Sequence, residues 1–270
     1  MIIYKSINKL KKEVNFKANI GFVPTMGALH KGHISLIKSS QKNCKKTLVS
    51  IFINPSQFNK KNDLKNYPRN LKKDINILKK LKVDYLLTPT AEEVYKNRKN
   101  TKIKLSKNDK IMCALFRPGH FEGVLAVINQ FLQKFRPKNI FLGEKDYQQF
   151  YLIKKFIKKN FNINVFSCAT VRDKNNVALS SRNILLNKND LNKSSAIASS
   201  MLKFKSKIKK NISYTKNLNN IATKINNLKN IKIEYLEIRN KYNFSKNYNQ
   251  NNFKIFLAYY NKKIRLIDNY

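Results

Sequence analysis

The stretch IGFVPTMGALHKGH, residues 20–33, combines an apolar run, a glycine-containing turn and two histidines three positions apart. The run IGFVPT predicts a buried strand, and the residues from about His30 predict the start of a helix. The first amides of a helix have no partner within it and carry partial positive charge, so this junction favours anionic oxygen. Residues three apart share one helix face, so we expect His30 and His33 to point together as donors of a phosphate cradle, in which Gly32 lets the ligand approach the backbone.

The same stretch admits three other interpretations. HxxH spacing is a weak metal signal, and a zinc site would need further ligands from His120 or from scattered cysteines. Gly27 and Gly32 have the spacing of a P-loop, but His33 and Ile34 stand where that motif has a lysine and a hydroxyl residue, and a GxGxxG fingerprint is absent. Two packed histidines at a helix start would be a purely structural explanation, which accounts poorly for the glycine pair.

Around this stretch, short β-rich runs alternate with amphipathic segments over about the first 170 residues. This order is typical of βαβ units in a parallel sheet. After about residue 176 the pattern changes to polar helical sequence followed by β-like runs, which predicts a smaller α+β domain with an antiparallel sheet. We expect an α/β domain over 1–175, with strands at 20–25, 47–53, 84–89, 139–143 and 163–170 and helices at 33–44, 68–81, 123–135 and 146–159, and a second domain over 176–270, with a helical region at 188–229 and strands at 231–238, 253–260 and 263–268.

Polar residues collect after the predicted strands, where open parallel sheets bind their ligands. In the segment GEKDYQQ (143–149), Lys145 could neutralise phosphate, Asp146 could accept hydrogen bonds from ribose hydroxyls, and Gln149 would face the same cleft. Gln57 in NPSQF offers another neutral amide. Each of these side chains could instead be an ordinary solvated position.

The segment LSSRN, residues 179–183, opens the helical region after the fifth predicted strand. Ser180 or Ser181 suits a helix cap. The two hydroxyls together with Arg182 could also form an anion clamp that closes on a polyphosphate.

Charge is the most unusual feature of the composition. The chain has 48 lysines and 8 arginines against 15 acidic residues, a formal charge of +41. The lysines are spread from end to end instead of forming a stripe, so we expect no specific nucleic-acid partner despite this charge. Arginines in loop-like contexts are candidates for anion contacts, because a guanidinium grips an anion at two points, although they could be ordinary surface residues; these are Arg69, Arg117, Arg172 and Arg182.

Hydropathy and cysteine content indicate the compartment. No apolar run is long enough for a transmembrane helix, and the first residues do not read as a signal peptide. The three cysteines, Cys44, Cys113 and Cys168, are far apart, which predicts buried thiols instead of a disulfide framework or a zinc knuckle. We therefore expect a cytoplasmic protein with no membrane partner.

Seven motifs follow one another along the chain: FVPTMGALHKGH, SIFINPSQF, YPRNLKKD, RPGHFEGV, FLGEKDYQQ, TVRDKNNVALSSRN and RLID. Together they resemble the pantothenate synthetase (pantoate–β-alanine ligase) family, within the HIGH-motif nucleotidyltransferase superfamily, over about residues 20–268. The resemblance implies a Rossmann-like first domain, a smaller second domain and a homodimer. It implies that ATP and pantoate form pantoyl adenylate and pyrophosphate, and that the amine of β-alanine then displaces AMP to give pantothenate.

The resemblance also implies site residues. His33 would be the acid-type residue at the phosphates, assisted by His30, with Lys145 and Arg182 as further catalytic residues. Gln57 and Gln149 would hold pantoate and β-alanine. Magnesium is expected with ATP, near Asp74 on a loose match. The residues expected to bind ATP are Met26, Gly27, Ala28, Leu29, His30, Lys31, Gly32, His33, Gly143, Glu144, Lys145, Asp146, Val171, Leu179, Ser180, Ser181 and Arg182.

An acyl adenylate is prone to hydrolysis, which predicts an element that closes over the site. The polar segment 59–70 and the second domain are the candidate lids. Two other functions stay open. One is a different nucleotidyltransferase of the same superfamily acting on a phosphorylated substrate, and the other, suggested by charge alone, is a nucleic-acid-binding protein.

Overall fold

The computed structural model describes residues 1–59, 61–95 and 103–270, so residue 60 of the candidate lid lies outside the described residues. The chain divides into two compact units, Met1–Ala169 and Thr170–Tyr270. Residues 170–175, which the sequence places in the first domain, thus belong to the second unit. The reason is Arg172, whose guanidinium binds Asp268 and whose backbone forms a β-bridge with Ala178.

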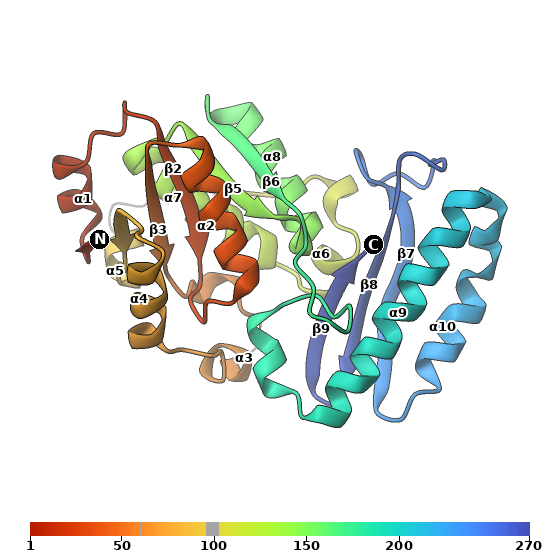
Figure 1. The fold of residues 1–270 in the computed structure, drawn as a ribbon. Coiled ribbons are helices and arrows are strands. Elements are labelled where there is room, and N and C mark those ends of the chain that lie inside the picture. Colours follow the sequence, from red (N-terminus) through yellow and green to blue (C-terminus); the bar gives the residue numbers. More distant parts are fainter. Residues whose placement is uncertain (60, 96–102) are drawn as a thin grey trace. The chain divides into compact units, whose positions relative to one another are not determined.

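The first unit contains a six-stranded parallel sheet, which confirms the predicted fold class (Figure 1). The sequence did not predict its first strand, because three residues at a sheet edge are too short to show a pattern, and Ile2 and Ile3 are 55% and 41% exposed. In the order β1-β4-β3-β2-β5-β6, the strands are β1 (Ile2–Tyr4), β2 (Ile20–Thr25), β3 (Lys46–Ile51), β4 (Tyr85–Leu87), β5 (Asn139–Gly143) and β6 (Asn164–Cys168).

Helices cover both faces of this sheet (Figure 1). On one face, Val23 packs with α2 (Lys31–Asn43) and α4 (Leu71–Lys80). On the other, the ring of Phe22 contacts Phe131 and Phe135 of α7 (His120–Phe135) at centroid distances of 5.8 and 5.1 Å. Neighbouring strand residues thus point to opposite faces, and α7 is buried as the sequence predicts. Further elements are α1 (Ile7–Glu13), α3 (Lys61–Lys65), α5 (Ala91–Tyr95), α6 (Cys113–Phe116), α8 (Tyr147–Asn160) and the 3₁₀ helices η1 (Pro55–Gln57), η2 (Lys107–Asp109) and η3 (Glu144–Asp146).

The strand order reverses between β2 and β5, which lie side by side at the centre of the sheet. The pairing of β2 with β3 continues to Thr25↔Ile51, whereas the pairs of β2 with β5 end at Phe22↔Ile140. The carboxyl ends of β2 and β5 therefore separate. Ligands of open α/β sheets bind at such a reversal point, and the segments that leave it here are 26–33 and 144–149.

The second unit contains an antiparallel sheet in the order β7-β8-β9, as the sequence predicts. Ile197 and Phe204 of the long helix α9 belong to the same apolar core as Ile255 and Leu257 of β8. The elements of this unit are η4 (Ser181–Leu185), α9 (Lys188–Lys210), η5 (Ile212–Asn217), α10 (Leu218–Asn226), β7 (Ile231–Asn240), β8 (Phe253–Asn261) and β9 (Ile264–Asn269).

Among the helices of the described residues, none combines the length and the apolar character needed to cross a lipid bilayer.

Candidate active site

The loop between β2 and α2 is held by Asp74 of α4. The backbone amides of Ala28 and Leu29 donate to its two carboxylate oxygens at 2.9 and 2.8 Å. Gly27 has a φ of +79°, and a Cβ there would come within 3.0 Å of Asp74 Oδ2. Burial raises the pKa of the Asp74 carboxyl, and the two amide hydrogen bonds oppose this rise. The carboxylate and the glycine together therefore fix the backbone that leads into the histidines.

His30 and His33 form a reciprocal cap at the start of α2. The Nδ1 of His30 accepts a hydrogen bond from the Gly32 amide at 3.1 Å, and the Nδ1 of His33 accepts one from the His30 amide at 3.4 Å. A neutral imidazole has one proton, so each ring that accepts at Nδ1 carries its proton on Nε2. The ring centroids lie 4.2 Å apart. The cap thus fixes two adjacent Nε2–H donors at a helix N-terminus.

Both rings are neutral at physiological pH. Burial, together with the positive charge of Lys145, lowers the pKa of His30 to about 4, and Asp146 opposes this shift. Burial and the neighbouring His30 lower the pKa of His33 to about 3. Lys145 lowers this pKa further, and Asp146 opposes the shift. The groups after β2 and after β5 therefore influence one another electrostatically, as expected of one site at the sheet reversal.

One expectation about this junction was wrong. The sequence predicts that the first-turn amides of the helix are unpaired, but the Gly32 amide donates to His30. His30 also precedes the helix as its cap instead of lying on its face. The donors that the junction offers to a ligand are therefore the imidazole N–H groups, because the His30 and Gly32 amides are used within the cap.

Residues after β5 divide into ligand candidates and structural groups. Lys145 Nζ lies 3.1 Å from Asp146 Oδ1, and the lysine side chain is the more buried of the two, at 19% against 44% exposed. Gln148 is buried, and its amide donates to the Ile111 carbonyl at 2.8 Å. Gln149 is half-buried, and its side chain has no hydrogen-bond partner among the residues that the structure describes. Of the two glutamines, Gln149 is therefore the one able to bind a ligand.

Gln57 lies beside the loop between β2 and α2, residues 26–30, which we call the histidine loop. It is the last residue of η1 and is buried. Its side-chain Nε2 lies 2.9 Å from Met26 Sδ, and its Oε1 accepts a hydrogen bond from Asn54 Nδ2 at 3.3 Å. The structure thus brings the segment after β3 to the segment after β2.

A cavity of about 360 Å³ opens at the carboxyl ends of β2, β3 and β4. Its lining includes Met26, Gly27 and Ala28 of the histidine loop, together with Arg69 and Asp74. The volume is in the range of small-molecule sites. The Arg69 guanidinium, a predicted anion contact, donates to the Leu64 carbonyl at 2.6 Å.

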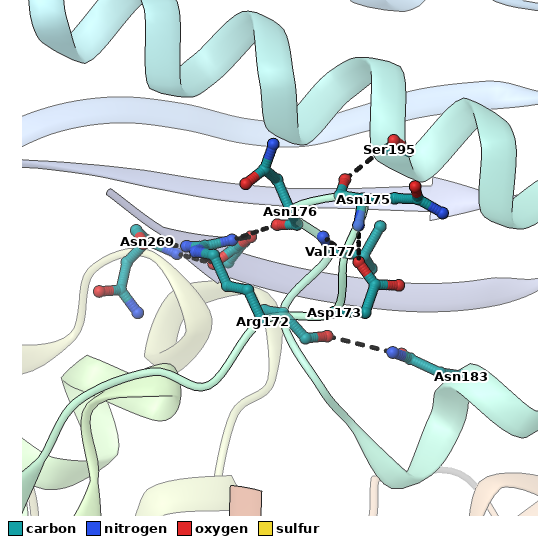
Figure 2. A network of polar contacts seen from close by, with 10 residues as sticks. Arg172, Asp173, Asn175, Asn176, Val177, Asn183, Ser195 and Asn269 are labelled. Carbon is teal, nitrogen blue, oxygen red and sulfur yellow. Dashed lines mark hydrogen bonds and ion pairs between the residues drawn. The ribbon is translucent and has the colours of Figure 1, made fainter. Parts of the chain in front are cut away.

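In the second unit, Arg172 is the centre of the polar network in Figure 2. Its guanidinium donates to both carboxylate oxygens of Asp268 at 2.7 and 2.9 Å and to the Asn176 carbonyl at 2.9 Å. The ring of Tyr270 lies 4.8 Å from the guanidinium carbon. The predicted anion contact of Arg172 is therefore made with a carboxylate of the protein itself.

This network precedes the serine–arginine segment. The Leu179 amide donates to the Val171 carbonyl at 2.9 Å, which closes the loop that Arg172 anchors. Ser180 then caps η4, because its hydroxyl accepts a hydrogen bond from the Arg182 amide at 3.2 Å, and Ser181 is buried. The predicted cap is confirmed for Ser180.

The described part of the chain contains no group of three or more His, Cys, Asp or Glu residues that could hold a metal ion. Cys113 and Cys168 are buried free thiols as predicted, and Cys44 is half-buried.

The sequence analysis considered the third histidine, His120, only as a further ligand of a zinc site. Both Arg117, a predicted anion contact that precedes α7, and His120, the first residue of α7, contact the carbonyl oxygen of Gln57 in η1. The signal was present in the sequence, since RPGH places a histidine three residues after one of only 8 arginines.

Comparison with known proteins agrees with this geometry. The family model described as pantoate-beta-alanine ligase matches residues 2–270. The pantothenate synthetase of Francisella tularensis subsp. novicida is 38% identical over 271 residues, which cover 98% of this chain and 94% of that protein. The pantothenate synthetase of Pseudothermotoga lettingae is 38% identical over 248 residues, which cover 88% of this chain and 86% of that protein.

Solved structures are similar over the full length. The pantothenate synthetase from Thermus thermophilus has a TM-score of 0.91 and 27% identity, covering 100% of this chain and 99% of that one. The pantoate-beta-alanine ligase from Francisella tularensis, complexed with beta-gamma ATP and beta-alanine, has a TM-score of 0.84 and 37% identity, covering 100% and 97%. From its strand reversal, its paired histidines and these matches, the chain belongs to the pantoate–β-alanine ligase family.

Proposed function

We propose that the chain condenses pantoate with β-alanine at the expense of ATP and releases pantothenate, AMP and pyrophosphate through a pantoyl adenylate. The observation that carries this proposal is the pair of neutral imidazoles, His30 and His33, fixed at a helix N-terminus where the strand order reverses. Family membership supports the substrates, as does the related ligase complexed with beta-gamma ATP and beta-alanine.

The first step places charge where these donors lie. Attack of the pantoate carboxylate on the α-phosphorus builds negative charge on the nonbridging oxygens and on the departing pyrophosphate. Donors that are fixed before the reaction stabilise this charge without reorganisation, so no nucleophilic side chain is needed. With pKa values of about 3 and 4, His33 and His30 act as hydrogen-bond donors that keep their protons, and Lys145 supplies positive charge. In the second step the β-alanine amine attacks the acyl carbon, and AMP leaves.

The remaining assignments rest on the family resemblance. In the first unit, 26–33 and 143–146 would contact ATP, and in the second unit Val171 and 179–182 would do so. Gln57 and Gln149 would hold pantoate, since neutral amides can donate to its carboxylate and accept from its hydroxyls.

Magnesium would bind with ATP and neutralise phosphate charge. Both oxygens of Asp74, the candidate ligand, already accept backbone amides. Magnesium in nucleotide sites takes most of its ligands from phosphates and water, with one or two carboxylates from the protein. A site with few protein ligands fits this preference, so the ion would be held mainly by the nucleotide.

A homodimer in the cytoplasm completes the proposal, supported by the resemblance. Sedimentation equilibrium of the purified protein should give twice the chain mass of 31.7 kDa.

Product analysis tests the proposed reaction. Purified protein with magnesium and ATP should form AMP and pantothenate in equal amounts, and only when pantoate and β-alanine are both present. A nucleotidyltransferase acting on a phosphorylated substrate would release pyrophosphate without needing β-alanine. Folded protein that forms no AMP with all substrates present would contradict the assignment.

A further inference from the structure

The first turn of α7 is in direct backbone contact with η1, the turn that carries Gln57. A Cβ at Gly123 would lie 2.4 Å from the Ser56 carbonyl oxygen and 3.0 Å from the Gln57 nitrogen, so only glycine permits this approach. The Gly123 carbonyl also accepts a hydrogen bond from Asn54 Nδ2 at 3.0 Å. The position of Gln57 is therefore coupled to the RPGHFEG segment.

His120 and Arg117 hold the backbone of Gln57 from the same turn. The Gln57 carbonyl oxygen lies 2.7 Å from His120 Nδ1 and 3.3 Å from Arg117 Nη2. A carbonyl oxygen can only accept, so His120 carries a proton on Nδ1. Arg117 Nη1 lies 3.0 Å from His120 Nε2, and because a guanidinium can only donate, this nitrogen is unprotonated. His120 is thus a neutral ring of the opposite tautomer to His30 and His33.

The side chain of Gln57 is fixed by groups that depend on the same packing. Its Oε1 accepts from Asn54, which is itself anchored by the Gly123 carbonyl and by the Tyr95 hydroxyl at 2.6 Å. Its Nε2 lies against Met26 Sδ in the histidine loop. Backbone and side chain of Gln57 are therefore both set by contacts that lead to the start of α7.

We infer that Arg117 and His120 are positioning residues for Gln57, so that pantoate affinity depends on them through this amide. The inference rests on the proposed role of Gln57 in binding pantoate. It gives the RPGH motif a function: its ring and guanidinium select one orientation of the turn after β3.

A matched pair of variants tests this role. His120→Leu keeps the approximate shape of the ring but removes the donor, whereas His120→Asn keeps an N–H at about the place of Nδ1. We expect His120→Leu to raise the KM for pantoate about tenfold, the effect of one lost buried hydrogen bond. The KM for ATP should stay unchanged, and His120→Asn should restore most of the pantoate affinity. Initial rates of pantoate-dependent pyrophosphate release give the KM values for pantoate and ATP in the wild type and in both variants. Gln133→Ala, which changes an exposed residue on the same helix, is the control and should leave both KM values unchanged.

A double-mutant cycle with Gln57→Ala separates the inference from the proposed function. If His120 acts through the Gln57 side chain, His120→Leu should add no further rise in pantoate KM to Gln57→Ala. A Gln57→Ala variant with unchanged pantoate KM would show that the proposed role of Gln57 is wrong. A raised KM in Gln57→Ala, combined with an unchanged KM in His120→Leu or with fully additive effects, would overturn the positioning role alone.

The variant Arg117→Lys tests the same positioning role if His120→Leu does not fold. Lysine keeps the charge but loses the fork that reaches both the Gln57 carbonyl and His120 Nε2. We expect a smaller rise in pantoate KM at unchanged ATP KM. A variant in which both KM values stay at the wild-type level would contradict the inference.

Discussion

At the scale of single residues, the site is defined by where protons sit. His30 and His33 each accept a backbone amide at Nδ1, and this hydrogen bond leaves the proton on Nε2. Burial keeps both rings neutral, so they offer directed N–H groups without the desolvation cost of a buried charge. The same arrangement makes the fold sensitive to acid.

The stability of the protein should fall as the pH drops from 7 to 5. In this window an unfolded histidine, with a pKa near 6.5, takes up a proton, whereas the folded rings, with pKa values of about 4 and 3, do not. The unfolded state therefore binds more protons than the folded state. Each histidine should lower the unfolding free energy at pH 5 by up to about 2 kcal/mol relative to its value at pH 7. Urea unfolding at several pH values measures this.

The double variant His30→Asn/His33→Gln provides the control for that experiment. It removes both titrating rings, so its unfolding free energy should depend less steeply on pH between 7 and 5. An equally steep dependence in the variant would mean that the two rings are not held neutral in the folded state.

At the scale of elements, the histidine loop depends on a residue of α4 that lies 45 and 46 positions further along the chain than the two amides it binds. Asp74 on α4 accepts the Ala28 and Leu29 amides, and Gly27 makes room for its carboxylate. The sequence suggested Asp74 only as a loosely matched metal ligand, because nothing in a local motif reveals an amide partner this far along the chain. The role became visible only when the packing of α4 against α2 was known.

Asp74→Asn tests this contact. The asparagine oxygen can accept one amide, but its NH₂ group would face the other donor, so one buried amide loses its partner. We expect a loss of about 1–3 kcal/mol in unfolding free energy. Urea unfolding measures it, with Glu92→Gln, an exposed carboxylate on α5, as the matched charge control. Equal stability of the two variants would contradict the role of Asp74 as an anchor.

Sequence patterns were sufficient for most elements of the fold. The runs at 20–25 and 139–143 coincide with β2 and β5, since buried parallel strands appear as continuous apolar stretches. The three-residue strand β1 has too few positions for a periodic signal. The candidate site was anticipated as residue types following strands, whereas tautomers, the cap at Gly32 and the Arg172–Asp268 pair depend on contacts between distant residues.

At the scale of the whole molecule, the formal charge of +41 is the dominant property. Like charges on one chain repel, and this repulsion weakens the compact state. Salt screens exposed charges over about 10 Å at 0.1 M, so added salt should relieve it.

The thermal unfolding temperature should therefore rise as NaCl increases from about 0.01 to 0.3 M, the range over which screening shortens the reach of exposed charges. KCl at equal ionic strength should give the same rise, because screening depends on ionic strength and not on the cation. Calorimetry or circular dichroism measures the temperature. An unchanged or lower value at high salt would show that self-repulsion does not limit stability.

The central claim is that neutral Nε2–H donors at the start of α2 stabilise the phosphates during adenylate formation. Pantoate-dependent exchange of labelled pyrophosphate into ATP tests it most directly, because it isolates that step. We predict that His33→Ala loses about a hundredfold in exchange rate, and that His33→Gln, which can place an N–H near the position of Nε2, retains more activity. Exchange by folded His33→Ala at the wild-type rate would contradict the account.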